Sequence, residues 1–537
     1  MKLVRFSLFD RFRSLPKGFN VTFREEYALA EKEINQFHPF CFAGLNGSGK
    51  SNVLEALAEI FNHLECCTFP EDITTLIDDQ KNFKKEVCQP DAFELEYLIV
   101  QQGKENPTFN DYVRVVIKKE SKKKPQIRFG TNDYVDLTHS IKSYLPELVI
   151  GYSSGENQIL NLPFLRAKML QFEEYLYSLD KSDLVFNKPE TSLTYMDYEM
   201  SQAILVTNFL MQNEATLEPI KNVLNIEKFY GFRIVINDIG YKGEKKEYES
   251  LLNKLNKHIN SLKKLATCYY KDGKSLHLDY YINDDTKTAF QDCFKSPIEL
   301  FRVFQILSIL NLRGFKPNSL KEVFTSNSLY ADQKINSERS VFYFNKFLIK
   351  KNEMKKPMLV RSFSDGEHQF LHSMGICLLL KNKSALLLLD EPETHFNPDW
   401  RSRFISILKD SLEKGGSNNI MRDILITSHS PFIISDCFPD KVIVFQNGQD
   451  PQNAKDMRFN TFGTSVNIVL EEIFKKEESI PQYSFEELNK IKNRVFNTLE
   501  EIQQAKEDAR ILGESPEKVF LFRHLILKEE EIKANKN

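Results

Sequence analysis

A glycine-rich stretch from Gly44 to Ser51 constrains the fold of this 537-residue chain more than any other feature. It reads G-L-N-G-S-G-K-S, follows the apolar run PFCFA, which is typical of a strand, and precedes NVLEALAEIFNHL, which is typical of an amphipathic helix. The backbone N–H groups of such a turn converge on an anion, and the helix N-terminus adds partial positive charge. The sequence therefore predicts a phosphate-binding loop, and an ordinary glycine turn before a helix is the weaker alternative.

Each position of this loop has an expected role toward a nucleoside triphosphate and Mg²⁺. We expect the Lys50 ammonium to reach the β- and γ-phosphates and the Ser51 hydroxyl to ligate Mg²⁺. The residues predicted to bind the nucleotide here are Asn46, Gly47, Ser48, Gly49, Lys50, Ser51 and Asn52.

A second carboxylate-bearing stretch, SALLLLDEPETHFNP, lies at residues 384–398. Its four consecutive leucines predict a strand buried on both faces of a parallel sheet. Ligands bind at the carboxyl ends of such strands, so Asp390 is a predicted Mg²⁺ ligand. Glu391, one residue further, can orient and deprotonate the attacking water. The alternative without a catalytic role is a polar strand end followed by a capped helix.

Two more patterns flank this strand. Upstream, Ser364-Asp365-Gly366-Glu367 opens a helix of about four turns, where a serine and a glycine at the start form either a second anion site or a plain N-cap. Downstream, a buried strand at 424–427 leads to His429. That histidine is predicted to contact the γ-phosphate, with a purely structural role as the alternative.

The order of these four motifs resembles the ABC-type ATPase heads of transporters and of the SMC, RecF and OLD families. The resemblance implies an α/β fold with a mixed sheet flanked by helices, bound ATP and Mg²⁺, and two heads that meet head to tail. It makes Glu391 the catalytic base and His429 the switch histidine, and it places Ser364, Gly366 and Glu367 in the partner's nucleotide site. A magnesium-sensing glutamine is also implied. Gln158 is our candidate, and Gln101 and Gln102 are the alternatives.

The separation of Ser51 from Ser364 is longer than a transporter head needs, so an insertion is expected. It lacks the sustained heptads of SMC coiled-coil arms. The predicted ranges are an N-terminal head lobe at 1–159, a mainly helical lid at 160–344, a C-terminal head lobe at 345–475 and a helical extension at 476–537. The extension is predicted to hold two helices, one starting at a Ser484 capping box and running past Ile502, and one starting at Ser515.

Charge and hydropathy exclude some classes. Lys plus Arg number 72 and Asp plus Glu number 75, so no global field attracts nucleic acid or membrane. The apolar runs fall short of the roughly 20 residues of a membrane-spanning helix, and the N-terminus lacks the apolar core of a signal peptide. We therefore expect a cytoplasmic protein without membrane contact.

Four further stretches carry a closer resemblance: MKLVRFSLFDRFRSLPKGF, GLNGSGKSNVLEALAEIF, VIGYSSGENQILNLPF and TFGTSVNIVLEEIF. Together they look like the PtuA-type ATPases of Septu and retron antiphage defence systems, within the restriction-system-associated AAA family. The resemblance implies an ATP-hydrolysing regulatory subunit that forms a homodimer or higher oligomer and controls a separately encoded HNH nuclease. In a retron, a reverse transcriptase and its RNA-linked DNA would also be partners.

The residues after the last head strand bear on nuclease activity. OLD-like ATPases often continue into a TOPRIM nuclease whose first strand ends in V-E-G, whereas this chain has Phe445-Gln446-Asn447-Gly448. The metal-binding glutamate is missing, so no intrinsic nuclease is expected. A RecF-like DNA clamp is the alternative function, and a transporter head is disfavoured by the insertion and the C-terminal helices.

Overall fold

The computed structural model describes residues 1–29, 34, 37–68, 84–102, 104, 108–154, 160–178, 192–237, 245–314, 340–379, 384–414, 422–476 and 478–534. The chain forms two units, Met1–Phe462 and Gly463–Asn537, and each is described by itself. The domain ranges predicted from the sequence stay predictions.

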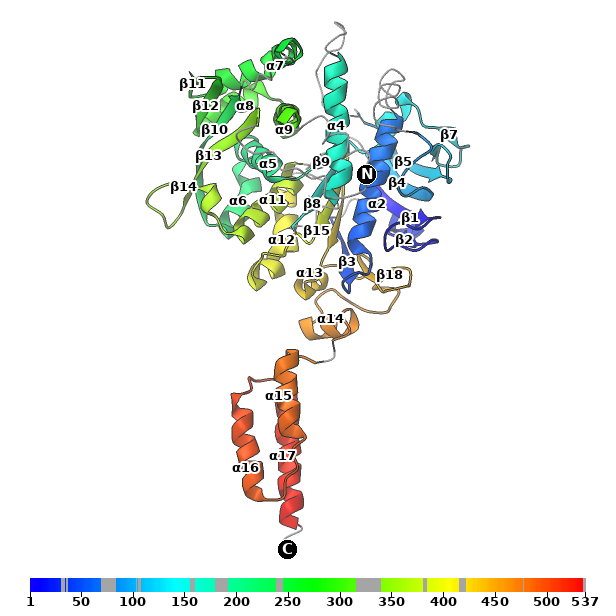
Figure 1. Ribbon diagram of the computed structural model, residues 1–537, viewed down its shortest axis with the longest axis vertical. Helices are drawn as coiled ribbons and strands as arrows, with labels where there is room; N and C mark the ends of the chain where they lie inside the picture. Colours follow the sequence, from blue (N-terminus) through cyan, green and yellow to red (C-terminus); the bar gives the residue numbers. More distant parts are fainter. Residues whose placement is uncertain are drawn as a thin grey trace. The chain divides into compact units, whose positions relative to one another are not determined.

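The strands of the larger unit form three sheets (Figure 1). Their bounds are β1 Lys2–Leu8, β2 Asn20–Thr22, β3 Phe40–Gly44, β4 Phe93–Val100, β5 Tyr112–Lys119, β6 Gln126–Phe129, β7 Val135–Asp136, β8 Leu148–Ser153, β9 Leu193–Tyr195, β10 Ile226–Asn237, β11 Cys268–Asp272, β12 Ser275–Tyr281, β13 Phe342–Lys351, β14 Met358–Leu359, β15 Ala385–Asp390, β16 Arg422–Thr427, β17 Val442–Phe445 and β18 Gln452–Asn453.

The α-helices cover these sheets and make up the smaller unit. Their bounds are α2 Lys50–Cys67, α4 Asn161–Ser178, α5 Tyr198–Met211, α6 Glu214–Val223, α7 Lys245–Leu265, α8 Asp284–Cys293, α9 Pro297–Ile309, α11 Asp365–Leu379, α12 Pro398–Lys414, α13 Pro431–Ser435, α14 Val466–Glu472, α15 Gln482–Lys492, α16 Leu499–Asp508 and α17 Pro516–Ala534.

A seven-stranded sheet with the order β18-β17-β3-β16-β15-β8-β9 forms the centre of the larger unit. Neighbours from β17 to β9 are parallel, and β18 alone is antiparallel. Leu386 to Leu389 of β15 are fully buried, as their unbroken apolar run predicts for a strand covered on both faces. Because β3, β15 and β16 are parallel, the residues that follow them all emerge at one edge.

Helix α2 lies between this sheet and the antiparallel six-stranded sheet β2-β1-β4-β5-β6-β7. Leu57 of α2 shares one apolar core with Tyr97 of β4 and Leu388 of β15. The polar side of α2 is buried too: Glu59 pairs with Arg166 of α4, which runs beside α2 in Figure 1. The amphipathic pattern thus predicted the helix correctly but did not predict that both of its sides are buried.

A buried ion cluster joins the beginning of the chain to the central sheet. The guanidinium of Arg24 donates two hydrogen bonds of 2.6 and 2.7 Å to the carboxylate of Asp423 in β16. The backbone N–H of Leu3 donates to the same carboxylate at 2.6 Å. Breaking one partner of such a buried pair costs about 3–5 kcal/mol, so this cluster fixes β1 against the sheet.

The predicted helices of the insertion pack with an antiparallel five-stranded sheet with the order β11-β12-β10-β13-β14, whose strands β13 and β14 extend beyond residue 344, the predicted end of the insertion. Helices α5, α6, α7 and α9 contact this sheet. β10 and β13 are 12 and 10 residues long, but register shifts interrupt their pairing, so their sequences lack the regular alternation that predicts a strand. The larger unit is therefore α/β, with a mixed sheet flanked by helices, as predicted.

The smaller unit packs α15, α16 and α17 around a core of its own. The prediction of two helices here is wrong, because the chain breaks between α15 and α16. The side chain of Thr498 caps α16 in a capping box with Glu501, whereas Ser484 lies inside the first turn of α15. Within the described residues, no helix is both long and apolar enough to cross a membrane.

Candidate functional site

The turn between β3 and α2 has the backbone geometry of a loop that wraps an anion. Gly44, Gly47 and Gly49 have φ angles of 141°, 76° and 99°, which only glycine adopts readily. A Cβ added at Gly44 would also lie 2.3 Å from the carbonyl oxygen of Phe445. Gly49 is the N-cap of α2, and no side chain caps this helix. Its first N–H groups therefore remain for a ligand.

Lys50 closes this loop on itself. Its ammonium donates to the carbonyl oxygens of Gly44 at 3.0 Å and Leu45 at 2.9 Å. Burial lowers the pKa of Lys50 to about 8, and the nearby Glu391 and Asp390 carboxylates oppose that shift. The Ser48 hydroxyl in the same loop is buried and makes no hydrogen bond within the described chain. A donor lysine and an orphaned hydroxyl fit a bound phosphate.

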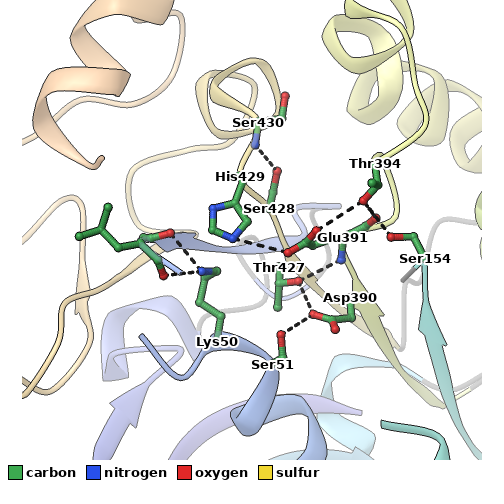
Figure 2. A network of polar contacts seen from close by, with 12 residues as sticks. Lys50, Ser51, Ser154, Asp390, Glu391, Thr394, Thr427, Ser428, His429 and Ser430 are labelled. Carbon is green, nitrogen blue, oxygen red and sulfur yellow. Dashed lines mark hydrogen bonds and ion pairs between the residues drawn. The ribbon is translucent and has the colours of Figure 1, made fainter. Parts of the chain in front are cut away.

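Three oxygen-bearing side chains meet at the end of β15 (Figure 2). The hydroxyls of Ser51 and Thr427 both donate to Oδ1 of Asp390, at 2.7 and 2.6 Å. Hydroxyl and carboxylate oxygens are the hard ligands that Mg²⁺ prefers. The donor set therefore fits the ion that the sequence predicts beside the phosphate loop.

Glu391 stands next to this group in a strained backbone conformation. Its φ angle is 49°, which costs a non-glycine residue on the order of 1 kcal/mol, and its N–H donates to the hydroxyl of Thr427 at 3.0 Å. This turn directs the carboxylate toward His429, whose Nε2 lies 3.5 Å from Oε1 of Glu391. Burial and the Asp390 charge raise the pKa of Glu391, and burial and the Lys50 charge lower that of His429.

A second glutamate links the loop after β15 to the segment around His429. Glu393 is buried and accepts a hydrogen bond from the hydroxyl of Ser428, and burial raises its pKa to about 7. Ser428 in turn accepts from the N–H of Ser430 at 2.9 Å. The guanidinium of Arg401 donates to the carbonyl oxygen of Glu393 at 3.3 Å. The segments that bear Glu391 and His429 are therefore fixed together.

The start of α11 is closed by its own side chains. Oε2 of Glu367 accepts from the N–H of Ser364 at 2.9 Å and from its hydroxyl at 3.2 Å, and the N–H of Glu367 donates back at 3.4 Å. Lys351 pairs with the other carboxylate oxygen. A Cβ added at Gly366 would lie 2.6 Å from the carbonyl oxygen of His395. Gly366 therefore lets α11 approach the loop after β15.

The predicted residues fall into two groups. Lys50, Ser51, Asp390, Glu391 and His429 meet around the ends of β3, β15 and β16 (Figure 2). The hydrogen bonds of Ser364 and Glu367, in contrast, join them to each other and to Lys351.

The remaining predicted residues have other surroundings. Asn46 and Gly47 are exposed at the tip of the loop, and Asn52 accepts a hydrogen bond from Ser14 at 2.6 Å. Gln158 lies outside the described residues, although β8, which precedes it, ends with Ser153 paired to Asp390.

The two alternative glutamines lie at the end of β4, in the six-stranded sheet. Gln101 donates to the Ser143 hydroxyl at 3.2 Å, and Gln102 donates to the Leu145 carbonyl oxygen at 2.8 Å. Both side-chain amides are thus bonded within the lobe that carries them.

Four residues at the site were not predicted: Thr427, Ser428, Glu393 and Gln369. Thr427 and Ser428 directly precede His429, so their place at the end of a buried strand was a usable signal. Gln369 lies in α11 and donates to the carbonyl oxygen of Glu391 at 3.4 Å, while its own Oε1 accepts from the N–H of His395 at 2.8 Å. No spacing in the sequence indicates that contact.

One family model matches the part of the chain that carries most of these residues. A family model described as "AAA domain, putative AbiEii toxin, Type IV TA system" matches residues 289–435, which include Asp390, Glu391 and His429. This match supports an ATP-binding ATPase domain. No curated protein matches the chain.

Among solved structures, one titled "Crystal structure of the SmcHead bound to the C-winged helix domain of ScpA" is similar with a TM-score of 0.33 and 10% identity. The similarity covers 84% of this chain and 96% of that chain.

Proposed function

We propose that this chain binds ATP with Mg²⁺ and hydrolyses it to ADP and phosphate at the carboxyl edge of the seven-stranded sheet. The observation that carries the proposal is the convergence of Lys50, Ser51, Asp390, Glu391 and His429 from three separate stretches of sequence. A lysine for phosphate, an oxygen pair for Mg²⁺ and a carboxylate base are the groups that phosphoryl transfer to water needs.

The side chains would act in a defined order. When phosphate enters the loop, Lys50 exchanges the carbonyl oxygens of Gly44 and Leu45 for phosphate oxygens. Ser51 and Asp390 would hold Mg²⁺, which neutralises charge developing on the phosphates. Glu391 would take the proton of the attacking water, a role that its raised pKa favours. When the γ-phosphate is bound, the Nε2–H of His429, which lies 3.5 Å from Oε1 of Glu391, would turn to the γ-phosphate instead.

The biological role that we propose is the regulatory subunit of an antiphage defence complex. Two heads would enclose two nucleotides, with Ser364, Gly366 and Glu367 of one copy at the site of the other. The complex would control an HNH nuclease encoded separately and, in a retron, would include a reverse transcriptase and its RNA-linked DNA. The resemblance to PtuA-type ATPases supports this role. The proposal of ATP hydrolysis does not depend on that resemblance.

Replacing Glu391 by glutamine tests the chemistry. Glu391→Gln keeps the size and one acceptor oxygen but removes the base, so ATP binding should persist while hydrolysis slows by at least about a hundredfold. Binding is measured with a fluorescent ATP analogue and turnover by phosphate release. Glu353→Gln, at an exposed site, is the matched control. Unchanged turnover in Glu391→Gln would remove Glu391 as the base.

The defence role needs a separate experiment. The tagged chain is isolated from cells that carry its neighbouring genes, and the proteins and nucleic acids that accompany it are identified. An HNH nuclease in the complex would support the role, and a reverse transcriptase with branched DNA would make it a retron. Bulk chromosomal DNA without protein partners would favour a RecF-like DNA clamp instead.

A further inference from the structure

Helix α17 of the smaller unit has two unlike long faces. Its inner face contributes Leu521 and Leu525, which are buried. They join a core formed by Leu488, Ile491, Ile502, Ala505 and Ala509. An ion pair between Lys506 of α16 and Glu529 of α17 closes the same side. The three helices therefore form their common core without the outer face of α17.

The outer face of α17 is apolar and open. Val519, Phe520, Ile526 and Leu527 are 63, 66, 48 and 51% exposed. A shallow groove runs along this side of the helix, with Val519, Phe522, Ile526 and Leu527 among its lining residues. Apolar side chains gathered in one stripe, rather than scattered, mark a surface that is covered in the working state.

The charges on α17 indicate what covers it. Lys518, Lys528, Glu529, Glu531 and Lys533 all take part in ion pairs within the smaller unit. Arg523 and Glu530 are exposed and line the groove, and the described part of the chain shows no ion pair for either. Glu517, near the start of the helix, accepts hydrogen bonds from Ser479 instead. Arg523 and Glu530 are opposite in sign, and both lie in the outer stripe.

Their spacing makes the stripe complementary to itself. Arg523 and Glu530 are seven positions apart, which is about two helical turns, so both project on one face. Ile526 and Leu527 lie midway between them. If a second α17 packs antiparallel with a twofold axis between Ile526 and Leu527, each Arg523 meets the Glu530 of the other copy and the apolar side chains meet at the centre. A parallel pair in register would instead place like charges together.

We propose that α17 pairs antiparallel with α17 of a second copy of this chain, which creates a self-association contact independent of nucleotide. A single helix pair buries less area than a stable interface requires, so the contact is weak alone. It gains strength when another contact already joins the same two chains, because the second contact then forms at a high effective concentration. The contact is distinct from the nucleotide-dependent head contact proposed above.

Charge reversal tests this pairing in the full-length chain without nucleotide. Sedimentation equilibrium over about 1–200 µM should show a monomer–dimer equilibrium for the parent. Arg523→Glu or Glu530→Arg alone should weaken dimerisation by about tenfold or more, because each change places like charges opposite one another twice per dimer. An equimolar mixture of the two variants should recover the parent affinity, since charges are complementary only in the mixed dimer.

Arg510→Glu, at a 72% exposed side chain in the same unit, is the matched control and should leave the equilibrium unchanged. Circular dichroism confirms that each variant keeps its helices. A parent that stays monomeric throughout the range overturns the proposal. So does a mixture that dimerises no better than the single variants, because another partner, or the rest of the same chain, must then cover this face.

Discussion

Helices α2 and α11 both begin at a predicted anion site, yet the two starts are built in opposite ways. At α2, no side chain caps the helix, Gly49 supplies the turn, and the Ser48 hydroxyl lies buried without a partner. At α11, Ser364 and Glu367 cap each other, and Lys351 neutralises the carboxylate. The first start leaves its N–H groups for a ligand, whereas the second is complete within one chain.

The difference shows that the hydrogen bonds at a helix N-terminus indicate whether an anion can bind there. A capping box satisfies the N–H groups that would otherwise bind an anion. A phosphate at α11 must therefore compete with the carboxylate of Glu367, which carries the same charge. The proposed role of Ser364 in a partner's nucleotide site requires that competition, and the following experiments separate the two starts.

The largest effect on ATP binding and hydrolysis is expected at the uncapped start of α2, called the open start here. Lys50→Met removes the ammonium that the loop holds ready for phosphate, and both ATP binding and hydrolysis should be lost, with turnover down by about 10²–10³. Equilibrium binding of a fluorescent ATP analogue and phosphate release measure the two losses. Lys346→Met, at an exposed site in β13, is the control and should retain both. Tight ATP binding by Lys50→Met would show that the nucleotide lies elsewhere.

A bulky side chain at the capped start of α11 should slow ATP hydrolysis without weakening ATP binding. Ser364→Arg places a bulky side chain where the second head would approach, so turnover should fall by about a hundredfold while the affinity of each monomer for ATP stays within about twofold. Ser364→Ala, which loses only the hydroxyl, separates the steric block from the loss of the cap. Full turnover in Ser364→Arg would contradict a site shared between two chains.

Glu393 tests how rigidly the two catalytic segments must be joined. Glu393→Ala removes the bond to Ser428, and we expect turnover to fall about tenfold, mainly in kcat. Glu393→Gln keeps an acceptor for Ser428 and should recover most of the activity. Equal losses in the alanine and glutamine variants would show that the hydrogen bond is not what matters.

The pH dependence of stability provides a second test of Glu393. Burial raises its pKa from 4.5 to about 7, so the folded state holds a proton that the unfolded state releases between these pH values. Its stabilising effect is complete below pH 4.5 and is lost as the pH rises through 7. Glu393→Gln does not titrate, so its stability relative to the parent should rise with pH over this window, by up to about 3 kcal/mol.

The smallest effect is expected at Glu367. Glu367→Gln keeps a capping side chain but removes the charge that opposes phosphate, so KM for ATP should fall a few-fold and kcat should change little. Loss of the ion pair with Lys351 should cost about 1 kcal/mol or less in unfolding experiments. A higher KM in this variant would mean that the carboxylate helps to hold the nucleotide.

The sequence predicted the open start well because every element of it is local. A strand, three glycines and a helix follow one another within 30 residues, and each has its own pattern. Asp390 and His429 were equally easy to predict from the sequence. Each lies at or just after the end of a strand whose continuous apolar run indicates that the strand is buried. Predicting the relation between Glu393 and Ser428 requires the pairing of β15 with β16, which no local pattern contains.

The break in the smaller unit was missed for a related reason. Apolar residues continue at helical spacing from Leu488 through Val495 to Ile502, so the pattern favours one helix. The structure ends α15 at Lys492, and Val495 is 81% exposed in the irregular segment that follows. Periodicity alone did not outweigh the local hydrogen bonds that Thr498 makes with Glu501.

The place of β3 in the central sheet determines when, during synthesis, the chain can first bind nucleotide. The strand that carries the phosphate loop ends at Gly44, yet its neighbours on either side are β16 and β17, which end at Thr427 and Phe445. A nascent chain of 400 residues thus contains the loop and lacks both strands that hold it. Nucleotide binding must therefore wait until translation has passed Phe445.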